Sequence, residues 1–352
     1  MQETEVIIVG QGLAGTWLSW WLRQAGVSFK LIDQPDPNGA SFRAAGLINP
    51  VTGRRLVNTW MIDELMPFAS AAYREIGNFL HESFIEETSV IDFFPSVQML
   101  QAFQKRYEED HLYLVPGEDR EKYAGWFRYD LGWGAIQPAW LVSVDKILTA
   151  WRNRLQKMDL MVEEVFDISK LNQSPGKVEY SDIQARYIIF CDGKSSSGNP
   201  FFKRLPFALN KGEGMLVEIN EIPSKQVFKK GMSLVPYKEN IFWLGSSYEW
   251  EFNDDQPSET FRNQAESWLH HFLKSPFRII EHFAAIRPAT LERKPFVGFH
   301  PLYPHIGILN GMGTKGCSLS PYFAKQLTNL ITGQGTIHPL ADINRFERVL
   351  RR

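Results

Sequence analysis

Apolar residues near the start of the chain follow first the pattern of a buried strand and then that of an amphipathic helix. Residues 5–9 are almost wholly apolar, which is typical of a strand covered on both faces of a parallel sheet. Gly26 is placed to end the helix that follows, and residues 27–32 form a second strand that ends at Asp33. One face of the predicted helix carries Ala14, Trp17, Leu18, Trp21, Leu22 and Ala25.

Strand and helix patterns also alternate in the second quarter of the chain. Residues 161–168 and 185–193 are expected to be strands, with a turn at 174–177 between them. The second of these strands ends in Asp192 and Gly193. A preceding helix is predicted from the spacing of Leu141, Val144, Leu148, Trp151 and Leu155.

The segment 206–287 differs in character from the segments on either side. Residues 211–219, 232–250 and 283–290 favour antiparallel strands joined by hairpin turns. They surround one helix, marked by Phe261, Ala265, Trp268 and Phe272. After residue 300 the earlier pattern returns as a strand at 306–310, a glycine turn at 311–316 and a helix at 320–331.

The first strand runs into three glycines spaced as Gly-x-Gly-x-x-Gly. Gly10 permits the tight turn, Gly12 lets the backbone approach a pyrophosphate, and Gly15 lets the helix pack on the strand. The helix N-terminus supplies N–H donors and positive potential. An acid at Asp33 suits the ribose hydroxyls of the adenosine and disfavours a 2′-phosphate, which argues against NADP. The candidate dinucleotide contacts in this segment are Gly10, Gly12, Leu13, Ala14, Gly15 and Asp33.

Together these patterns predict an α/β fold, α+β overall, with two domains. A Rossmann-like nucleotide-binding domain takes residues 1–80, 136–205 and 288–352. It is interrupted by a mostly antiparallel β-sheet domain, the candidate substrate domain, formed by residues 81–135 and 206–287.

Composition narrows the class of protein. The 352 residues carry a net charge of −2 with no long block of one sign, which argues against a dedicated nucleic-acid binder. The acidic N-terminus and the lack of a long apolar stretch predict a cytoplasmic protein without a membrane partner. Cys191 and Cys317 are far apart and are expected to be small buried residues, and no metal site is expected.

NAD and FAD both fit the first glycine turn, so the choice depends on the second one. The segment 310–321 again aims a helix N-terminus at a ligand, with Thr314 and Lys315 in the loop. Reduced flavin carries negative charge near N1 and O2, which N–H groups and a helix dipole stabilise, whereas a nicotinamide ring has no such need. The alternative is a second structural turn with a surface lysine.

Four segments, in this order along the chain, resemble the FAD-dependent D-amino acid oxidase and glycine oxidase superfamily. They are residues 6–33, 38–50, 286–301 and 307–321. Within the superfamily, "NGAS" at 38–41 and the run from 287 to 298 most resemble glycine oxidase. They also resemble the FAD domain of the bifunctional enzyme that completes the methylaminomethyl group of a tRNA wobble uridine, in 5-methylaminomethyl-2-thiouridine biosynthesis.

The resemblance implies a noncovalent FAD with its adenine over the first glycine turn and its flavin ring near the domain boundary. Val165 looks like the residue whose backbone contacts the adenine. Asp192 and Gly193 are included among the candidate cofactor contacts. The residues that match the loop along the pyrophosphate and flavin are Ser41, Arg43, Ala44, Ala45 and Gly46. Those that match the turn at the flavin pyrimidine edge are Gly313, Thr314, Lys315 and Gly316.

The resemblance also implies the reacting site. Arg287 matches the arginine that forks onto a substrate carboxylate, and its planar guanidinium suits that bidentate role. Tyr248 matches a substrate-facing position, although a tyrosine at a strand end is often only packing. Ser233 departs from the pattern, because the family places a tyrosine just before "VP". The carboxylate clamp is therefore expected to be incomplete, which makes simple amino acids less favoured as substrates.

Two histidines and two arginines outside these motifs are weaker candidates for binding a ligand. His270 and His271 are adjacent on a helix and point about 100° apart, which is poor geometry for one metal ion. Arg54 and Arg55 lie in a loop that suits an anionic substrate or RNA, with a solvated loop slightly favoured. Hydride transfer from a neutral amine needs no strong protein base, and no acid–base pair is nominated.

We therefore expect an FAD-dependent amine or amino-acid oxidoreductase, an oxidase or a dehydrogenase. It would oxidise a C–N bond by passing hydride to flavin N5, and its partner would be a small-molecule amine or amino acid. A flavin-dependent enzyme that modifies the wobble uridine of tRNA is the second hypothesis. The third is a catalytically silent FAD-binding redox module, and an NAD-linked dehydrogenase is least favoured.

Overall fold

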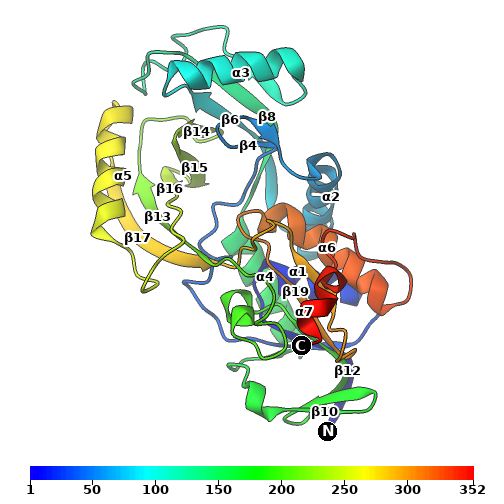
Figure 1. The fold of residues 1–352 in the computed structure, drawn as a ribbon. Coiled ribbons are helices and arrows are strands. Elements are labelled where there is room, and N and C mark those ends of the chain that lie inside the picture. The colour runs from blue at the N-terminus through cyan, green and yellow to red at the C-terminus, as the bar shows by residue number, and fades with distance from the viewer.

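The computed structural model describes all residues from 1 to 352 and is built around two sheets (Figure 1). The core of the first sheet is parallel and contains β1 (Gln2–Val9), β2 (Phe29–Ile32), β9 (Met161–Val162), β12 (Ile183–Phe190) and β19 (Ile306–Asn310). Their spatial order is β19-β12-β1-β2-β9. Three antiparallel strands extend this sheet: β10 (Leu171–Ser174), β11 (Lys177–Tyr180) and β18 (Phe296–Phe299).

Three helices pack together beside the parallel strands, namely α1 (Leu13–Gln24), α4 (Val144–Lys157) and α6 (Gly316–Ile331). The helix α1 is buried on more than the one face that its pattern predicts. Trp20 packs edge-on against Trp151 of α4, with 5.5 Å between ring centroids. Trp21 donates its indole N–H to the carbonyl of Pro321 in α6 at 2.9 Å. The second half of α1 is therefore held by both neighbouring helices.

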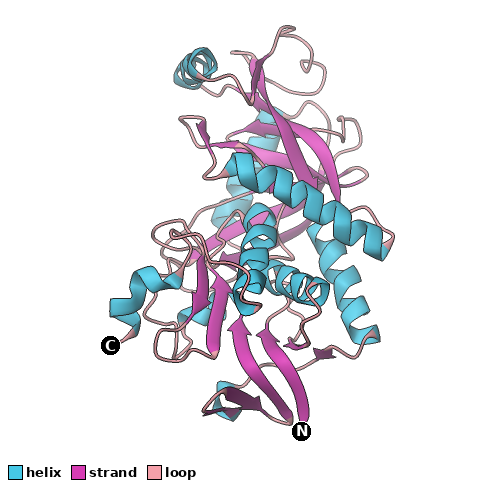
Figure 2. Cartoon of the chain, turned by 90° about the vertical axis from the view of Figure 1, so that its right-hand side faces the viewer, coloured by secondary structure: helices cyan, strands magenta, loops and turns pink.

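The second sheet has nine strands and stands apart from the first (Figure 2). Its order is β17-β13-β16-β15-β14-β6-β8-β3, with β7 also paired to β8, and all pairings are antiparallel except that of β14 with β6. The strands are β3 (Leu47–Ile48), β6 (Ile85–Phe93), β7 (Leu114–Pro116), β8 (Trp133–Val142), β13 (Asn210–Glu218), β14 (Val227–Lys230), β15 (Met232–Lys238), β16 (Ile241–Gly245) and β17 (Arg278–Arg287).

The remaining elements cover these sheets or connect them. They are α2 (Ile62–Leu80), α3 (Val97–Glu109), α5 (Glu259–Phe272), α7 (Glu347–Leu350) and the small pair β4 (Val51–Thr52) and β5 (Val57–Asn58). Three short 3-10 helices complete the chain: η1 (Ile168–Lys170), η2 (Gly193–Ser197) and η3 (Ile343–Phe346).

The two faces of the second sheet carry different residues, as the two-residue period of a strand requires. One face packs on α5 and buries Phe228, Leu234, Phe242 and Leu244 against Phe261. The residues between them in sequence point to the opposite face, toward the first sheet. This inner face includes Lys229, Ser233, Trp243, Gly245, Phe283, Ala285 and Arg287. It forms one wall of the cavity described below.

The structure confirms the fold class predicted from the sequence, and it differs in two local details. Of the strand expected over 161–168, only Met161 and Val162 pair with β2. The rest leaves the sheet, and Val165 is 68% exposed. The helix expected from Leu141 begins at Val144, because Leu141 is paired with β3 as part of β8.

The domain division is kept as a proposal. Leu47–Ile48 and the end of β8 belong to the second sheet, although they lie in segments that we assigned to the nucleotide-binding domain.

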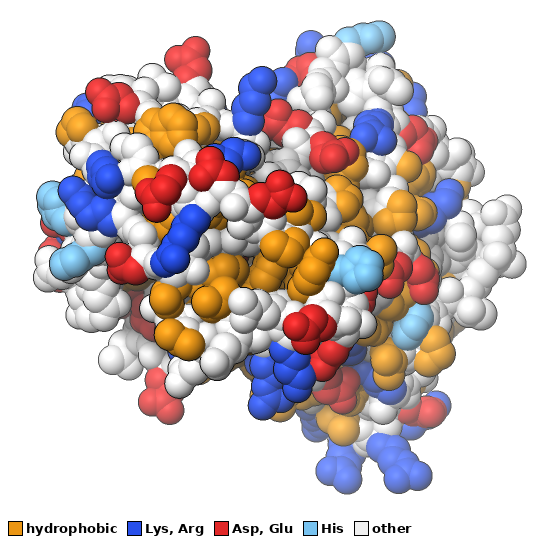
Figure 3. Space-filling model, turned by 90° about the horizontal axis from the view of Figure 1, so that it is seen from above, with side chains coloured by type: hydrophobic (Ala, Val, Ile, Leu, Met, Phe, Trp, Pro, Cys, Tyr) orange, Lys and Arg blue, Asp and Glu red, His pale blue; other side chains and the backbone are white.

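The surface seen from the α3 end shows acidic and basic side chains interspersed, without a broad field of one sign (Figure 3). This matches the net charge of −2. Among the helices, none combines the length and the apolar character that crossing a bilayer demands.

Candidate active site

A cavity of about 690 Å³ runs between the parallel sheet and the inner face of the second sheet. Its lining includes Val9, Ile32, Cys191 and Asn310, which stand at the carboxyl ends of β1, β2, β12 and β19. Ligands of open α/β sheets bind at that edge. All the site residues predicted from the sequence line this cavity except Gly15.

The first glycine turn leaves no room for side chains. A Cβ on Gly10 would lie 2.7 Å from the carbonyl oxygen of Cys191, and Gly10 has a φ of +95°. A Cβ on Gly15 would lie 1.9 Å from the Gly10 oxygen, so Gly15 sets the contact of α1 with β1 and does not reach the cavity. Gly12 begins α1 without a side-chain cap, and no acid stands in the first turn. The Leu13 N–H is donated to Ser41 Oγ at 3.1 Å.

Asp33 is held by a cluster of polar groups at the end of β2. Its Oδ1 accepts a hydrogen bond from the backbone N–H of Gln11 at 2.9 Å, and its Oδ2 accepts one from Arg152 Nη1 at 2.6 Å. The buried Arg152 also donates to Gln11 Oε1 at 3.0 Å and to Glu163 Oε1 at 3.1 Å. Sequence reasoning missed Arg152, although an arginine one turn from Leu148 on an apolar helix face is a usable signal.

The loop at 38–46 connects the cofactor side of the cavity to the second sheet. Gly46 has a φ of +79°, and a Cβ there would lie 1.9 Å from the Val142 oxygen. The guanidinium carbon of Arg43 lies 4.8 Å from the Phe283 ring centroid, and its Nη1 pairs with Glu281 Oε1 at 2.8 Å. The Arg43 carbonyl accepts the indole N–H of Trp243 at 3.0 Å. Ala44 and Ala45, which are small, complete the lining of this loop.

Three predicted contacts, Val165, Asp192 and Gly193, line the cavity near the end of β12. Val165 lines it at the exposed segment after β9. Burial raises the pKa of Asp192 to about 6, although the Ser196 hydroxyl donates to its carboxylate. The carbonyl of Gly193 accepts Asn310 Nδ2 at 2.9 Å. This end of the cavity therefore combines an exposed apolar residue with a carboxyl group that is easily protonated.

The second glycine turn places the N-terminus of α6 against the same cavity. Gly313 has a φ of +56°, and a Cβ on Gly316 would lie 3.0 Å from Leu13 Cδ1 of α1. Lys315 begins the helix, and its Nζ donates to Thr59 Oγ1 at 3.2 Å. Burial and the nearby charge of Arg293 lower the pKa of Lys315 to about 8. Thr314 lines the cavity beside it.

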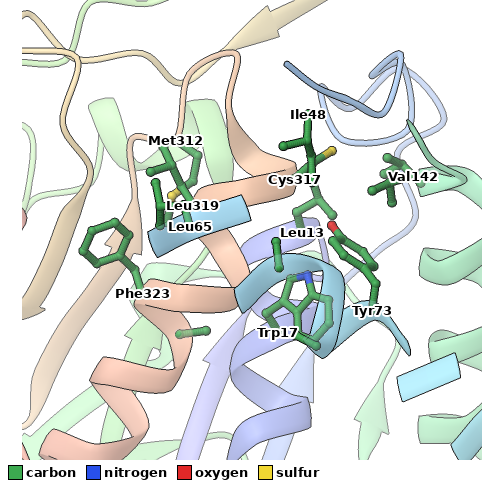
Figure 4. Close-up of a cluster of buried hydrophobic side chains, with 14 of the residues drawn as sticks. Leu13, Trp17, Ile48, Leu65, Tyr73, Val142, Met312, Cys317, Leu319 and Phe323 are labelled. Carbon is green, nitrogen blue, oxygen red and sulfur yellow. The ribbon is translucent and has the colours of Figure 1, made fainter. Parts of the chain in front are cut away.

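The floor below this turn is apolar. Figure 4 shows Cys317 of α6 close to Leu13, Ile48 and Tyr73. Both cysteines are buried and free. Burial raises the pKa of the Cys317 thiol to about 12, so it stays protonated and packs as a small apolar residue.

Arg287 lies flat on a glycine at the far end of the cavity. A Cβ on Gly212 would lie 1.9 Å from Arg287 Nη2. Arg287 Nη1 donates to Asn210 Oδ1 at 2.7 Å and to the Ser247 carbonyl at 3.2 Å, whereas Nη2 and Nε have no acceptor in the protein. The ring of Tyr248 lies 4.8 Å from the guanidinium carbon. Burial lowers the pKa of Arg287, a cost that an anionic partner would offset.

Glu213 contacts the loop that carries Tyr248 through its backbone, and its carboxylate is buried against Ser258 and His282. Glu213 is fully buried, and it accepts the N–H of Ser258 at 2.7 Å and Nε2 of His282 at 2.9 Å. Its own N–H is donated to Ser247 Oγ at 2.9 Å. This cluster was not found from the sequence, because its members come from β13, β17 and two loops.

Residues 5–330 match the family model described as DAO, FAD dependent oxidoreductase. The chain belongs to this family. The resemblance noted from the sequence is therefore confirmed, and so are its cofactor, FAD, and its class, an FAD-dependent oxidoreductase.

Individual relatives are distant from this member of the FAD-dependent family. It is 24% identical to glycine oxidase of Pseudomonas aeruginosa over 143 residues, which are 39% of this chain and 39% of that protein. Glycine oxidase from Geobacillus kaustophilus superposes with a TM-score of 0.81 at 17% identity, over 98% of both chains. L-proline dehydrogenase from P. horikoshii gives 0.78 at 14% identity, over 99% of this chain and 98% of that one. These structures share the fold.

The residues of the cavity fit FAD. Two helices, α1 and α6, point N-termini without side-chain caps at one space, which suits a pyrophosphate and an electron-rich flavin edge. The close approaches at Gly10 and Gly12 provide the cradle that a pyrophosphate requires. Arg43 and Lys315 add two cations to the same lining.

The other polar residues singled out from the sequence lie elsewhere. His270 and His271 are on α5, where His270 contacts Phe277 with 4.9 Å between rings and His271 Nδ1 lies 2.6 Å from the Ser267 oxygen. Arg54 and Arg55 are exposed in the turn between β4 and β5. No cluster of three or more histidine, cysteine or acidic residues has the geometry to hold a metal ion.

Proposed function

We propose that this FAD-dependent oxidoreductase oxidises a C–N bond of a small amine or amino acid. The observation that carries the proposal is the geometry of Arg287. Its Nη2 and Nε hydrogens have no acceptor, while its position is fixed by Asn210 and the Ser247 carbonyl. A guanidinium with one fixed edge and one free edge can receive a carboxylate through two parallel hydrogen bonds.

The proposal is supported by the lining of one cavity, which includes both Arg287 and the two glycine turns. When bound, FAD supplies an acceptor for the hydride that leaves the carbon bearing the nitrogen, and water then hydrolyses the resulting imine. Arg287 orients the substrate, and Tyr248 covers the guanidinium at the mouth of the cavity, where its own side chain is 60% exposed. Tyr248 thereby acts as a positioning residue in this proposal.

Proton transfer needs no dedicated base here. No histidine lines the cavity. We therefore infer that the amine binds in its neutral form, so its nitrogen lone pair can form the C=N bond as the hydride leaves. Activity should consequently rise with pH as the substrate amine loses its proton.

The named relatives support the class of substrate. Glycine oxidase, iminodiacetate oxidase from Chelativorans sp. BNC1 and L-proline dehydrogenase share this fold, and each is named for an amino acid or a related amine.

The test is anaerobic titration of the FAD-loaded protein with a panel of amines and amino acids. Loss of the flavin absorbance near 450 nm is expected for at least one amino acid, and Arg287→Met should prevent it without releasing FAD. Arg278→Met is the matched control, because Arg278 stands at the exposed start of the same strand and pairs with Glu218. A protein that holds FAD but is reduced by no amine would contradict the proposal and favour a redox module.

A second candidate, modification of a tRNA wobble uridine, is supported by one feature. Thr52 and Gly53 line the cavity, and Arg54 and Arg55 follow them on the surface, where they can contact phosphates. Incubation with tRNA from cells lacking this gene, followed by nucleoside mass spectrometry, tests it. A mass change at the wobble position that needs FAD would support it, and unchanged nucleosides would contradict it.

A further inference from the structure

A line of paired residues crosses the inner face of the second sheet. In the register of the strands, Lys229 of β14 lies between Asp92 of β6 and Ser233 of β15, and Ser233 is opposite Gly245 of β16. Lys229, Ser233 and Gly245 line the cavity, whereas Asp92 lies behind Lys229. The cavity therefore extends along this line, away from Arg287, to a second cation.

Small residues leave the way to Lys229 open. Gly231 forms the turn between β14 and β15 with a φ of +84°, and it lines the cavity together with Ser233. A large side chain at position 233 would stand beside Lys229 on the same face, since the two residues are cross-strand partners.

Lys229 is held in a fixed position, and its ammonium group has N–H donors beyond the one bonded to Asp92. Its Nζ lies 2.7 Å from Asp92 Oδ2, and the Asp92 side chain is only 3% exposed. An ammonium group has three N–H donors, so two remain after the bond to Asp92. The Lys229 side chain keeps 22% of its surface exposed, on the side of the cavity.

Lys229 and Arg287 cannot bind the same carboxylate. Three strands separate β14 from β17 in the sheet, which puts their backbones about 19 Å apart at ordinary strand spacing. Both cationic groups are fixed by neighbours, Lys229 by Asp92 and Arg287 by Asn210. A single ligand that contacts both cations must therefore be long enough to join them.

The wall between Lys229 and Arg287 is mostly apolar, and Arg43, which lies on the Phe283 ring, is paired with Glu281. The Trp243 ring covers Gly245, where a Cβ would lie 2.5 Å from Trp243 Cη2. Phe283 stands next to it, with 6.4 Å between the ring centroids. Val235 lines the same stretch. A ligand lying along this wall would have polar ends and an apolar middle.

We propose that Lys229 is a specificity-determining residue, which donates hydrogen bonds to an acceptor group, a carboxylate or an amide carbonyl, at the distal end of an elongated amino-acid substrate. The inference rests on the proposed function, because the proximal end is the carboxylate on Arg287. Glycine-sized substrates leave the wall and Lys229 uncontacted, so they bind less tightly than elongated ones.

The test compares amino acids that differ only at the distal end. Glycine, 2-aminodecanoate, 2-aminodecanedioate and the ω-amide of the latter, in both enantiomers, are titrated anaerobically into the FAD-loaded protein, because a ten-carbon chain is long enough to join the two cations. We expect the substrates with a distal acceptor to give the lowest concentrations for half-reduction. Lys229→Met should raise those concentrations about tenfold or more and leave 2-aminodecanoate unchanged, since a hydrogen bond to a charged donor is lost.

The matched control is Lys230→Met. Lys230 is the next residue, and its Nζ bonds to the Arg128 carbonyl, outside the cavity lining. Ser233→Tyr is the second variant, which should exclude the elongated substrates while FAD stays bound. If Lys229→Met weakens every substrate equally, or if neither variant separates long from short substrates, the proposal is wrong.

Binding of ligands that cannot be oxidised distinguishes an error about the Lys229 site from an error about the proposed C–N oxidation. Sebacate, compared with decanoate, should perturb the flavin spectrum at lower concentrations in the wild type and lose that advantage in Lys229→Met. If no amine reduces the flavin but this difference persists, the reaction is wrong and the Lys229 site stands. If amines reduce it and this difference is absent, the Lys229 site is wrong.

Discussion

The guanidinium of Arg287 lies 4.8 Å from the ring centroid of Tyr248, which places a cation under an aromatic face at the mouth of the cavity. Gly212 is beneath the same guanidinium, since a Cβ there would lie 1.9 Å from Nη2. The arginine is thus held between a backbone and a ring, with Nη1 bonded to Asn210. Nε and Nη2 keep donors that have no acceptor in the protein.

Arg287→Lys keeps the positive charge and removes the planar guanidinium with its parallel N–H donors. We expect amino acids to reduce the flavin only at concentrations about 10 to 100 times higher, because one point contact replaces two parallel hydrogen bonds. The measurement is anaerobic half-reduction, with FAD content determined in parallel. Arg278→Lys, at the exposed start of the same strand, should leave both values unchanged. Equal affinity in wild type and Arg287→Lys would exclude a bidentate role.

The α/β core and the glycine turns could be predicted because their signals are local. The strand, the three glycines and the helix stand in consecutive positions of the sequence, and the structure has β1 and α1 there. The strand expected over 161–168 ends after Val162, because the residues that follow do not pair with β2. Their apolar character alone does not indicate whether a partner strand is present. Residues 163–168 turn away from the sheet toward the cavity, and the spacing of apolar residues in this segment does not indicate that turn.

The polar partners at the site could not be predicted, because they come from distant segments. Arg152 donates to Asp33 across 119 positions of the sequence, and Lys229 pairs with Asp92 across 137. Lys229 and Asp92, taken alone, resemble ordinary surface charges. Only the pairing of strands and helices in space shows that they are buried together.

Gly15→Ala should separate α1 from β1. The added methyl would lie 1.9 Å from the Gly10 oxygen, and that atom belongs to backbone that cannot turn aside. We expect a loss of about 1–3 kcal/mol in the free energy of unfolding and a sharp fall in FAD affinity, since the turn itself must shift. Urea unfolding of the apoprotein and FAD titration measure the two effects. Gly125→Ala, where nothing lies within 4 Å, is the control and should change neither.

Arg152→Lys should weaken the adenosine end of the FAD site. Arg152 donates to Asp33 Oδ2, to the Asp33 carbonyl and to Gln11 Oε1, and a lysine ammonium cannot reach all three. We expect a loss of about 2 kcal/mol in the free energy of unfolding, measured with urea, and weaker binding of both FAD and ADP. Arg154→Lys, exposed on the same helix, is the control. Unchanged ADP affinity would mean that Asp33 keeps its place without Arg152.

Lys315 should make FAD binding depend on pH. Its pKa of about 8 in the apoprotein lies below the ordinary lysine value, because burial disfavours the charged form. A bound anion favours that form, so above pH 8 each FAD that binds should take up a proton, and affinity should fall as pH rises. Below pH 8 the lysine is already protonated, and the affinity should be nearly constant.

The measurement is fluorescence titration of the apoprotein with FAD between pH 7 and 9. Lys315→Met should bind FAD more weakly at pH 7 and show no decline above pH 8. Lys325→Met is the control, because Lys325 is on the same helix with its Nζ 4.7 Å from the Trp21 ring, and it should keep the wild-type profile.

Unfolding of the apoprotein gives an independent check. Between pH 8 and 10.5 the Lys315 side chain binds more protons in the unfolded chain than in the folded one, so the free energy of unfolding of the wild type should increase with pH relative to that of Lys315→Met. A wild-type decline in FAD affinity that persists in Lys315→Met would assign the titration to another group.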